Sequence, residues 1–322
     1  MQELSGYTAL IEKEIEKLEL PSFPSNLYNP LRYFMSLGGK RMRPILTLLG
    51  TELFGEKKEN ALNAALTIEI FHNFSLIHDD IMDEAPLRRA KQTVHKKWNQ
   101  NIAILSGDVL FVKAYELLAK QNVKHLLPLI QLFNKTAIEV CEGQQMDMDF
   151  ESRNDVTIEE YIEMIRLKTS VLLGCALEMG AIIADASEQD CKHIYDFGQH
   201  LGIAFQIQDD ILDLYADPEK FGKQVGGDVI SNKKTLLNLK AFELANTEQK
   251  GLLKELATVT NFEHKVKETR QLYNIIGARE ICEKEMQEHY TFAMKSLQSI
   301  TISDTAKIPL IGLADYLMVR NW

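Results

Sequence analysis

Two short stretches of the sequence place several carboxylates in otherwise apolar surroundings. The first is LIHDDIMD, Leu76 to Asp83, and the second is FQIQDDILD, Phe205 to Asp213. Burying a carboxylate beside leucine, isoleucine and methionine is costly unless a cation or hydrogen-bond donors compensate its charge. The repeated D-D-x-x-D pattern therefore indicates that both stretches bind a cation.

The spacing within each stretch matches the face of a helix, because residues separated by four, three and four positions share one side. Two sets of residues have this spacing: His72, Leu76, Asp79 and Asp83, and Gly202, Gln206, Asp209 and Asp213. Carboxylate oxygens suit Mg²⁺, which one or two carboxylates typically hold while substrate phosphates and water complete its coordination. We therefore expect two helices that face each other across bound magnesium. A lone D-D-x-x-D is more often a solvated helix face, so this expectation depends on the second copy and on nearby cations.

Basic segments accompany both acidic stretches. KRMR, residues 40–43, precedes a proline that suits the first turn of a helix, where exposed N–H groups and the helix dipole favour anions. Arg88-Arg89 follows the first stretch, and the arginine fork grips phosphate at two points. Lys223 and the run Lys233-Lys234-Thr235 follow the second stretch. Together they predict two anion sites, one bridged by metal and one bound directly by cations.

The elements that position these residues should be helices. Apolar residues recur at intervals of three and four, with few alternating β-branched runs, and this spacing is typical of helices. We predict an all-α fold. Thr157–Glu160 has the pattern of a capping box that opens a helix running towards Gly180. The pair Gly38-Gly39 should end one helix, with residues 40–43 in the connection and Pro44 in the first turn of the next helix. Loops are expected at residues 21–30, 88–97 and 216–235.

Composition limits the class of protein. The chain has 322 residues, 45% of them hydrophobic, and a net charge of −10, which disfavours a general nucleic-acid binder. Four cysteines lie far apart without a C-x-x-C pair, which fits a reducing cytoplasm better than a disulfide framework or a zinc site. We expect no signal peptide, because the first twenty residues mix acidic side chains with leucines at helical spacing. We also expect no membrane segment, because the most apolar region, 171–184, is too short to span a bilayer. Since both acidic stretches should serve one site, residues 1–322 are predicted to form a single domain.

These motifs resemble those of the trans-isoprenyl diphosphate synthase, or polyprenyl synthetase, family. They are GGKRMRP, LIHDDIMDEAPLRR, GQQMD, LKT, FQIQDDILD and GGDVISNKKT, in the family's order over nearly the whole chain. The resemblance implies a helical bundle around a deep central cavity, a homodimer, and a short-chain enzyme similar to geranylgeranyl and farnesyl diphosphate synthases. Such an enzyme condenses isopentenyl diphosphate head-to-tail with dimethylallyl, geranyl or farnesyl diphosphate to give a C15–C20 trans-polyprenyl diphosphate.

The resemblance also implies roles for individual residues. Three Mg²⁺ ions are assigned to Asp79, Asp83 and Asp209, and the catalytic set further includes Asp80, Asp210 and Asp213. The contacts to the allylic diphosphate fall on Arg88, Lys168, Thr169, Gln206, Lys223 and Lys233. The contacts to isopentenyl diphosphate fall on Lys40, Arg43, His72 and Arg89. Metal and cations would stabilise the departing diphosphate, the isopentenyl double bond would attack the allylic cation, and a proton would then be lost without a dedicated side-chain base.

Product length should depend on which side chains close the cavity below the metal ions. In this family a bulky aromatic at Phe74, five positions before Asp79, looks like a floor that gives short products. Phe71, one turn deeper, could share this role. Ser75 stands where a second aromatic could stand, and the two-residue insertion of one bacterial farnesyl-forming subgroup is absent. These features favour C20 over C15.

A few positions depart from the family's pattern. Ala90 and Gln92 replace a glycine and a proline after the two arginines, Asn232 replaces a glycine, and Ser170 replaces a frequent alanine. The tail Arg320-Asn321-Trp322 is less basic than in some relatives, which leaves its role in closing the site open.

Three other readings compete with this one. A class I terpene cyclase also carries D-D-x-x-D, but its second metal motif differs and it needs no isopentenyl diphosphate site. A di-iron carboxylate protein could use Glu69-x-x-His72 but would require a second such motif, which the sequence lacks. A non-catalytic subunit of a heteromeric synthase tends to lose aspartates from the acidic motifs, whereas all six are present here.

Overall fold

The computed structural model describes residues 2–216 and 225–319. Helices make up nearly all of its regular structure, which confirms the all-α prediction; the strands found in the described residues are the two-residue pair β1 (Leu87–Arg88) and β2 (Lys91–Gln92). Lys223 and the tail Arg320-Asn321-Trp322 lie outside the described residues. In the described part of the chain, no helix combines the length and apolar character needed to cross a membrane.

The chain divides into two compact units, residues 1–135 with 175–194, and residues 136–174 with 195–322. The prediction of a single domain stays a prediction. The helices of the first unit are α1 (Gln2–Glu16), α2 (Ser25–Ser36), α3 (Met42–Leu53), η1 (Lys58–Ala61), α4 (Leu62–Met82), α5 (Val94–Lys97) and α6 (Gln100–Leu118), with the first part of α7 (Val123–Ser152) and most of α9 (Val171–Ile183).

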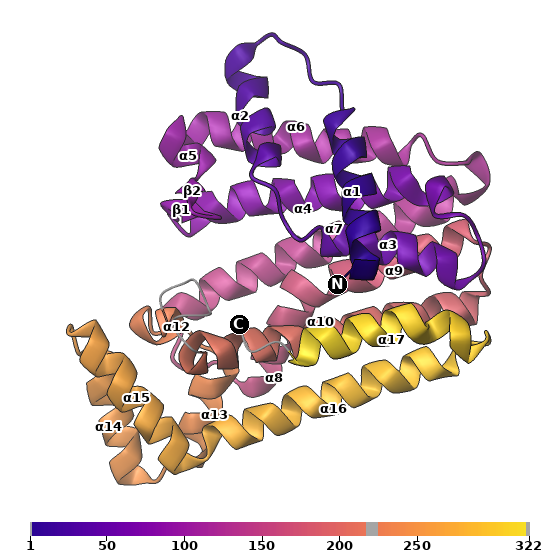
Figure 1. Cartoon of the computed structure of the whole chain (residues 1–322). Helices are drawn as coiled ribbons and strands as arrows, with labels where there is room; N and C mark the ends of the chain where they lie inside the picture. Colours follow the sequence, from indigo (N-terminus) through magenta and orange to yellow (C-terminus); the bar gives the residue numbers. More distant parts are fainter. Residues whose placement is uncertain (1, 217–224, 320–322) are drawn as a thin grey trace. The chain divides into compact units, whose positions relative to one another are not determined.

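Helix α4 forms the centre of the first unit. Ile68, Ile70, Phe71 and Ile77 are almost completely buried, and α4 runs side by side with α6 (Figure 1). A helix that is apolar on most sides belongs in a core, so its polar C-terminal end at Asp79 and Asp80 is held in a fixed place.

Helix α3 approaches α9 until their backbones touch. A Cβ atom added at Gly180 would come 2.3 Å from the carbonyl oxygen of Thr47, and one added at Gly50 would come 2.5 Å from that of Leu177. The Thr51 hydroxyl donates to the carbonyl of Gly180 at 3.2 Å. This contact fixes α3, whose first turn carries Arg43.

The second unit contains the rest of α7 and the helices α8 (Ile158–Ile165), η2 (Arg166–Ser170), α12 (Gly227–Ile230), α13 (Leu236–Leu244), α14 (Thr247–Ala257), α15 (Phe262–Ile276), α16 (Ala278–Ser299) and α17 (Asp304–Val319), with most of α10 (Glu188–Tyr215). The capping box is confirmed, since the Thr157 hydroxyl accepts from the Glu160 N–H at 3.2 Å and the Glu160 carboxylate accepts from the Thr157 N–H at 2.9 Å. The helix continues as predicted through α9, but η2 is a π turn.

Several local predictions were wrong. Residues 25–30 belong to α2, with Pro30 inside it, because burial of Pro30, Leu31 and Phe34 outweighs the break in helical hydrogen bonding that proline causes. Arg43 lies in the first turn of α3, and the connection stops at Arg41. The expected loops at 88–97 and 216–235 contain the β1–β2 hairpin with α5 and the short helix α12.

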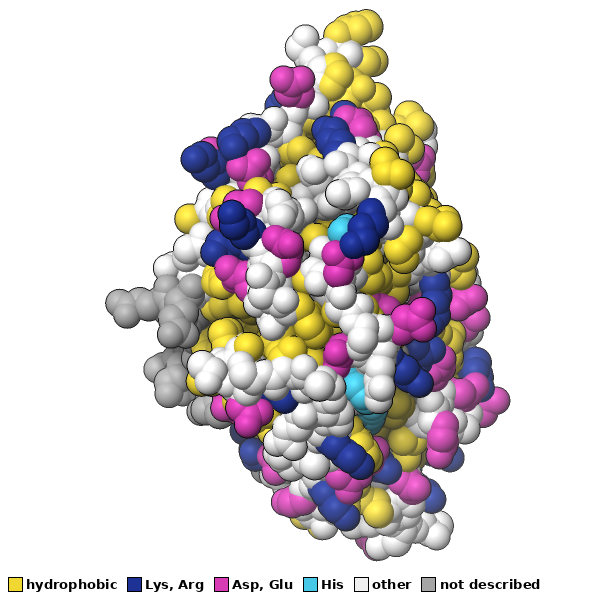
Figure 2. All heavy atoms as spheres, turned by 90° about the vertical axis from the view of Figure 1, so that its right-hand side faces the viewer, with side chains coloured by type: hydrophobic (Ala, Val, Ile, Leu, Met, Phe, Trp, Pro, Cys, Tyr) yellow, Lys and Arg dark blue, Asp and Glu magenta, His cyan; other side chains and the backbone are white. Residues whose placement is uncertain are grey.

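The surface of the molecule carries charged side chains of both signs. On the face drawn in Figure 2, Lys and Arg side chains are interspersed with Asp and Glu, and apolar side chains lie between them. Mixed charge of this kind is ordinary for a solvent-facing surface.

The tight contact between α3 and α9 makes Gly180 sensitive to substitution. We expect Gly180→Ala to lower the free energy of unfolding by about 1–3 kcal/mol, because the new methyl group must push the two helices apart. Denaturant unfolding measures this change. Gly6→Ala in α1 is the control, since a Cβ there meets no atom within 4 Å. Equal stability of the two variants would contradict the close packing.

Candidate active site

The first acidic cluster lies at the C-terminal end of α4. Asp79 and Asp80 belong to its last turn, and Asp83 follows as the C-cap. Arg88 in β1 bridges the pair: its Nε donates to Asp80 Oδ1 at 2.8 Å and its Nη2 donates to Asp79 Oδ2 at 3.2 Å. Arg88 thereby compensates part of the negative charge that the helix gathers here.

That compensation is incomplete at Asp80. Its side chain is 1% exposed, and its Oδ2 atom accepts no hydrogen bond from the described residues. Burial raises the pKa of Asp80 to about 6 although Arg88 opposes this change, and the charges of Asp79 and Asp83 raise it further. A divalent cation would supply the missing positive charge, and an all-oxygen donor set suits Mg²⁺. The residues of this cluster therefore fit the expected metal.

The hairpin after α4 carries the two predicted arginines. Leu87 pairs with Gln92 and Arg88 with Lys91, which leaves Arg89 and Ala90 as the loop. Both loop residues have positive φ, 52° and 60°, as the tight hairpin turn with two left-handed residues requires. Ala90 thus adopts the conformation that a glycine would adopt more easily, and the departure from the family's pattern does not prevent the turn.

The first turn of α3 places the cationic side chain of Arg43 against α4. Arg43 Nη1 lies 3.1 Å from His72 Nε2. Burial, followed by the charges of Arg43 and the other arginines nearby, keeps the pKa of His72 well below its usual range, so the ring is neutral and Nε2 accepts the hydrogen bond. Burial lowers the pKa of Arg43 to about 10, which leaves it protonated at neutral pH. The exposed Lys40 lies just before this turn.

Arg89 and Arg41 complete this cationic region in different ways. A Cβ at Gly39 would come 2.9 Å from Arg89 Nη2, so the glycine makes room for the guanidinium. Arg41 is buried and holds the segment in place: it pairs with Glu69, donates to Glu12 Oε1 at 2.8 Å and donates to the Met35 carbonyl at 3.2 Å. Because Glu69 is engaged with Arg41, the structure gives no support to the di-iron reading.

The second acidic cluster lies on α10 in the second unit. Tyr161 donates its hydroxyl to Asp210 Oδ2, and Gln206 Nε2 donates to Asp210 Oδ1 at 3.3 Å. Burial raises the pKa of Asp210 to about 7, and the charge of Asp228 adds to this effect. Asp213 Oδ2 accepts from the backbone N–H of Asp228 at 3.0 Å. Asp213 therefore fixes the start of the GGDVISNKKT segment.

The cations of the second unit converge on a residue that the sequence analysis did not single out. Lys168, in the π turn, donates to Asp147 Oδ2 at 2.6 Å, and Lys233 Nζ lies 4.0 Å from the same oxygen. Although burial raises it, these two lysines hold the pKa of Asp147 below its usual range. Thr169 Oγ1 lies 3.5 Å from Gln206 Oε1. Asp147 belongs to the quoted motif GQQMD, which was the available signal.

An aromatic cluster lies on the part of α4 that precedes the aspartates. The Phe74 ring stacks on Phe111 of α6, with centroids 4.9 Å apart and planes 19° apart. Phe71 is completely buried, and its ring centroid lies 5.6 Å from that of Phe74. The Ser75 hydroxyl donates to the His72 carbonyl at 2.9 Å. Sequence reasoning missed Phe111 because it comes from another helix.

The structure thus sorts the candidate residues into two groups, each within one unit. The first unit holds Lys40, Arg43, His72, Asp79, Asp80, Asp83, Arg88 and Arg89, and the second holds Lys168, Thr169, Gln206, Asp209, Asp210, Asp213 and Lys233. Among the described residues, no group of three or more His, Cys, Asp or Glu side chains is by itself placed to hold a metal ion. Phosphate oxygens and water commonly supply most ligands of Mg²⁺.

Comparison with known proteins connects these groups to a family. The sequence pattern of the polyprenyl synthetase family matches residues 24–276. The chain is 38% identical to a geranylgeranyl pyrophosphate synthase of Geoglobus acetivorans, over 97% of this chain and 96% of that protein. It is 35% identical to a geranylfarnesyl diphosphate synthase of Natronomonas pharaonis, over 93% of this chain and 91% of that one.

A solved structure agrees with the sequence relatives. The crystal structure of geranylgeranyl pyrophosphate synthetase from Pyrococcus horikoshii is 37% identical, covers 99% of this chain and 98% of its own, and superposes with a TM-score of 0.93. Family pattern, relatives and fold all agree with the resemblance seen in the motifs. The chain therefore belongs to the polyprenyl synthetase family.

Proposed function

We propose that this prenyltransferase condenses isopentenyl diphosphate head-to-tail with an allylic diphosphate and releases diphosphate. One observation supports the proposal: the first unit contains two clusters of cationic side chains with different partners. At one, Arg88 bridges Asp79 and Asp80, and the buried Asp80 Oδ2 accepts no hydrogen bond from the described residues. At the other, Arg43 meets a neutral His72. A metal-dependent site and a purely cationic site suit two diphosphates that are bound in different ways.

For the metal we infer that Asp79, Asp83 and Asp209 hold Mg²⁺, with three ions present when substrate is bound. The oxygen donors and the buried Asp80 Oδ2 fit this ion. Bound magnesium supplies Lewis-acid stabilisation of the leaving diphosphate.

The protein's own cations complete the charge balance of the reaction. Arg88, Lys168 and Lys233 bind the allylic diphosphate, and their charges stabilise the electron pair that it takes as its carbon–oxygen bond breaks. The isopentenyl double bond then forms the new carbon–carbon bond, and loss of a proton restores an alkene. No side chain of the described site is required as a base if the released diphosphate takes this proton. Contacts that strengthen as the bond breaks contribute most to the rate.

For the product we propose a C20 chain. The stacked rings of Phe74 and Phe111 form a bulky block on the α4–α6 pair, which supports a short product. The relatives named for geranylgeranyl products favour C20 over C15. We also propose a homodimer, which the exposed apolar side chains Leu105 and Val112 of α6 support. A cytoplasmic location remains a prediction from the sequence.

An activity assay tests the proposed function. The purified chain is incubated with Mg²⁺, isopentenyl diphosphate and an allylic diphosphate primer of C5, C10 or C15. We expect prenyl diphosphates that converge on C20, and no product after chelation of the metal. Hydrocarbon from an allylic diphosphate alone would favour the terpene cyclase reading. An inactive homogeneous protein would favour the non-catalytic subunit.

The metal assignment predicts the effect of two substitutions in that assay. Asp79→Ala and Asp209→Ala should each lower kcat by about a hundredfold or more, because each removes a ligand that stabilises the leaving group. Steady-state rates over a range of Mg²⁺ concentrations measure this loss. Glu151→Ala, at an exposed carboxylate of α7, is the matched control. Wild-type rates in either aspartate variant would remove that residue from the metal site.

The aromatic block predicts a change in product length. Phe74→Ala should lengthen the products, since it removes the ring that stacks on Phe111 and so reduces the bulk that we propose limits chain growth. Chromatographic sizing of the products measures the effect. Phe292→Ala, at a half-exposed ring of α16, should leave the distribution unchanged. If Phe74→Ala also left the product distribution unchanged, Phe74 would not be the residue that limits product length.

A further inference from the structure

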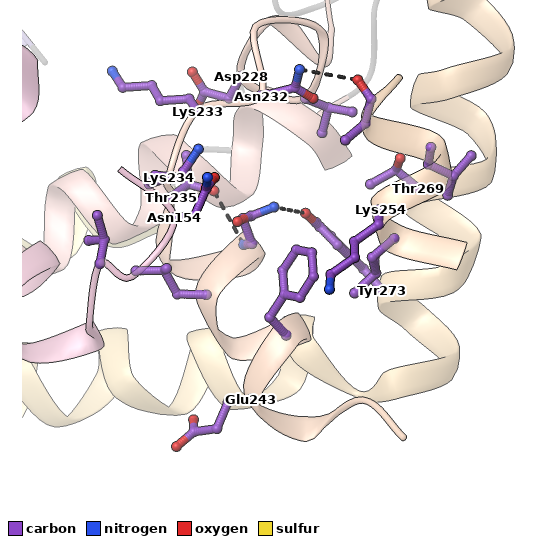
Figure 3. A pocket seen from close by; sticks show the side chains of 18 of the residues that line it. Asn154, Asp228, Asn232, Lys233, Lys234, Thr235, Glu243, Lys254, Thr269 and Tyr273 are labelled. Carbon is purple, nitrogen blue, oxygen red and sulfur yellow. Dashed lines mark hydrogen bonds between the residues drawn. The ribbon is translucent and has the colours of Figure 1, made fainter. Parts of the chain in front are cut away.

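A cavity of about 840 Å³ lies within the second unit, beneath the segment that carries Lys233 (Figure 3). Its apolar lining includes Val156, Ile158, Leu239, Phe242, Leu253 and Leu256. Figure 3 shows Lys233 and Asp228 side by side, with the Lys233 side chain extending away from Thr269 and Tyr273 on the opposite wall. Because a cavity lies under this segment, close packing does not by itself set the position of Lys233.

A buried lysine connects the segment to the helices behind it. Lys265 of α15 is 3% exposed, and its ammonium donates to Asn232 Oδ1 at 2.7 Å and to the carbonyls of Ile230 and Ala257 at 3.2 Å each. An ammonium has three donors, so all of them are used. In the described chain no carboxylate forms an ion pair with it, and burial lowers the pKa of Lys265. Burying a charge among neutral acceptors is costly, and the three hydrogen bonds offset part of this cost.

The three acceptors lie where the chain changes direction. Ile230 ends α12, Ala257 ends α14, and Asn232 immediately precedes Lys233. Asn232 has a φ of 57°, and its Nδ2 also donates to the Ala257 carbonyl at 3.2 Å. Left-handed backbone is strained for residues other than glycine, so such a conformation needs support from its surroundings.

The other end of the segment is fixed on the acidic helix. Asp213 Oδ2 accepts from the Asp228 N–H at 3.0 Å, and the Asp228 carbonyl accepts from the Lys233 N–H at 2.9 Å. The segment from Asp228 to Lys233 is thus held by α10 at its start and by Lys265 at its end. This arrangement places Lys233 Nζ 4.0 Å from Asp147, the carboxylate that also binds Lys168.

We propose that Lys265 is a positioning residue for diphosphate binding: by holding Asn232 and the ends of α12 and α14, it fixes Lys233 beside Lys168. The inference rests on the proposed function, in which Lys233 contacts the allylic diphosphate. It also explains the replacement of the family's glycine by Asn232. A glycine would allow the same backbone, whereas asparagine in addition supplies the shortest hydrogen bond to Lys265.

Calorimetric titration with inorganic diphosphate and Mg²⁺ tests the inference without requiring turnover. Lys265→Met removes all three donors and keeps a long unbranched side chain, and Lys267→Met changes an exposed lysine of the same helix. We expect Lys265→Met and Lys233→Ala each to raise Kd about tenfold, the loss typical of one charge-assisted hydrogen bond. The double variant should bind as Lys233→Ala does, because Lys265 acts only through Lys233. Lys267→Met should bind as the wild type.

Either of two results would overturn the proposal: Lys265→Met binding as tightly as Lys267→Met, or the two losses multiplying in the double variant. If Lys265→Met does not fold, Asn232→Gly takes its place, since it keeps the backbone and removes one acceptor; unchanged binding would then count against the proposal.

Kinetics separate positioning from a general structural defect. In the condensation assay, Lys265→Met should raise KM for the allylic diphosphate and leave KM for isopentenyl diphosphate within about twofold, because the cations assigned to that substrate lie in the first unit. Lys265→Arg, which keeps donors, should restore much of the loss. A fall in kcat with both KM values unchanged would indicate only fewer folded molecules and would contradict the proposal. A wild-type chain that binds diphosphate but forms no prenyl product would contradict the proposed function alone.

Discussion

Carboxylates that crowd a buried helix face need positive charge nearby, and this requirement governs the site in both units. Arg88 compensates Asp79 and Asp80 in the first unit, and Lys168 with Lys233 compensates Asp147 in the second. Among the described residues, these cations only partly offset the effect of burial on the carboxyl groups. Burial raises the pKa of Asp80 and Asp228 to about 6 and that of Asp210 to about 7, although basic groups oppose these changes. Buried carboxyl groups whose pKa is raised in this way would be stabilised as carboxylates by divalent ions.

The cationic segments share a second feature, which is a residue with left-handed backbone. Arg41 precedes α3 with a φ of 48°, Arg89 lies in the hairpin loop with 52°, and Asn232 precedes Lys233 with 57°. Each is supported by a separate interaction: the buried pair of Arg41 with Glu69, the pairing of β1 with β2, and the hydrogen bonds of Lys265. Strained backbone persists where its surroundings determine it.

Much of this organisation could be predicted from the sequence, because it follows from local patterns. Apolar spacing predicts the helices, the capping box at Thr157 is local in sequence, and the acidic stripes follow from helical periodicity. The rest depends on contacts between distant segments. Asp147 matters because Lys168 and Lys233 meet at its carboxylate. Phe111 matters because its ring stacks on Phe74 of α4. Lys265 matters because it hydrogen-bonds the ends of two helices that are distant in sequence. The helical position of Pro30 likewise reflects burial that no local pattern contains.

We propose that Asp79, Asp83 and Asp209 bind one diphosphate through shared metal ions. A crystal structure of the protein with Mg²⁺ and an allylic thiolodiphosphate, which resists ionisation, tests this claim directly. We expect a single headgroup whose oxygens share metal ions with Asp79, Asp83 and Asp209 and contact Arg88 and Lys168. A headgroup bound away from these aspartates, or held by only one acidic helix, would contradict it.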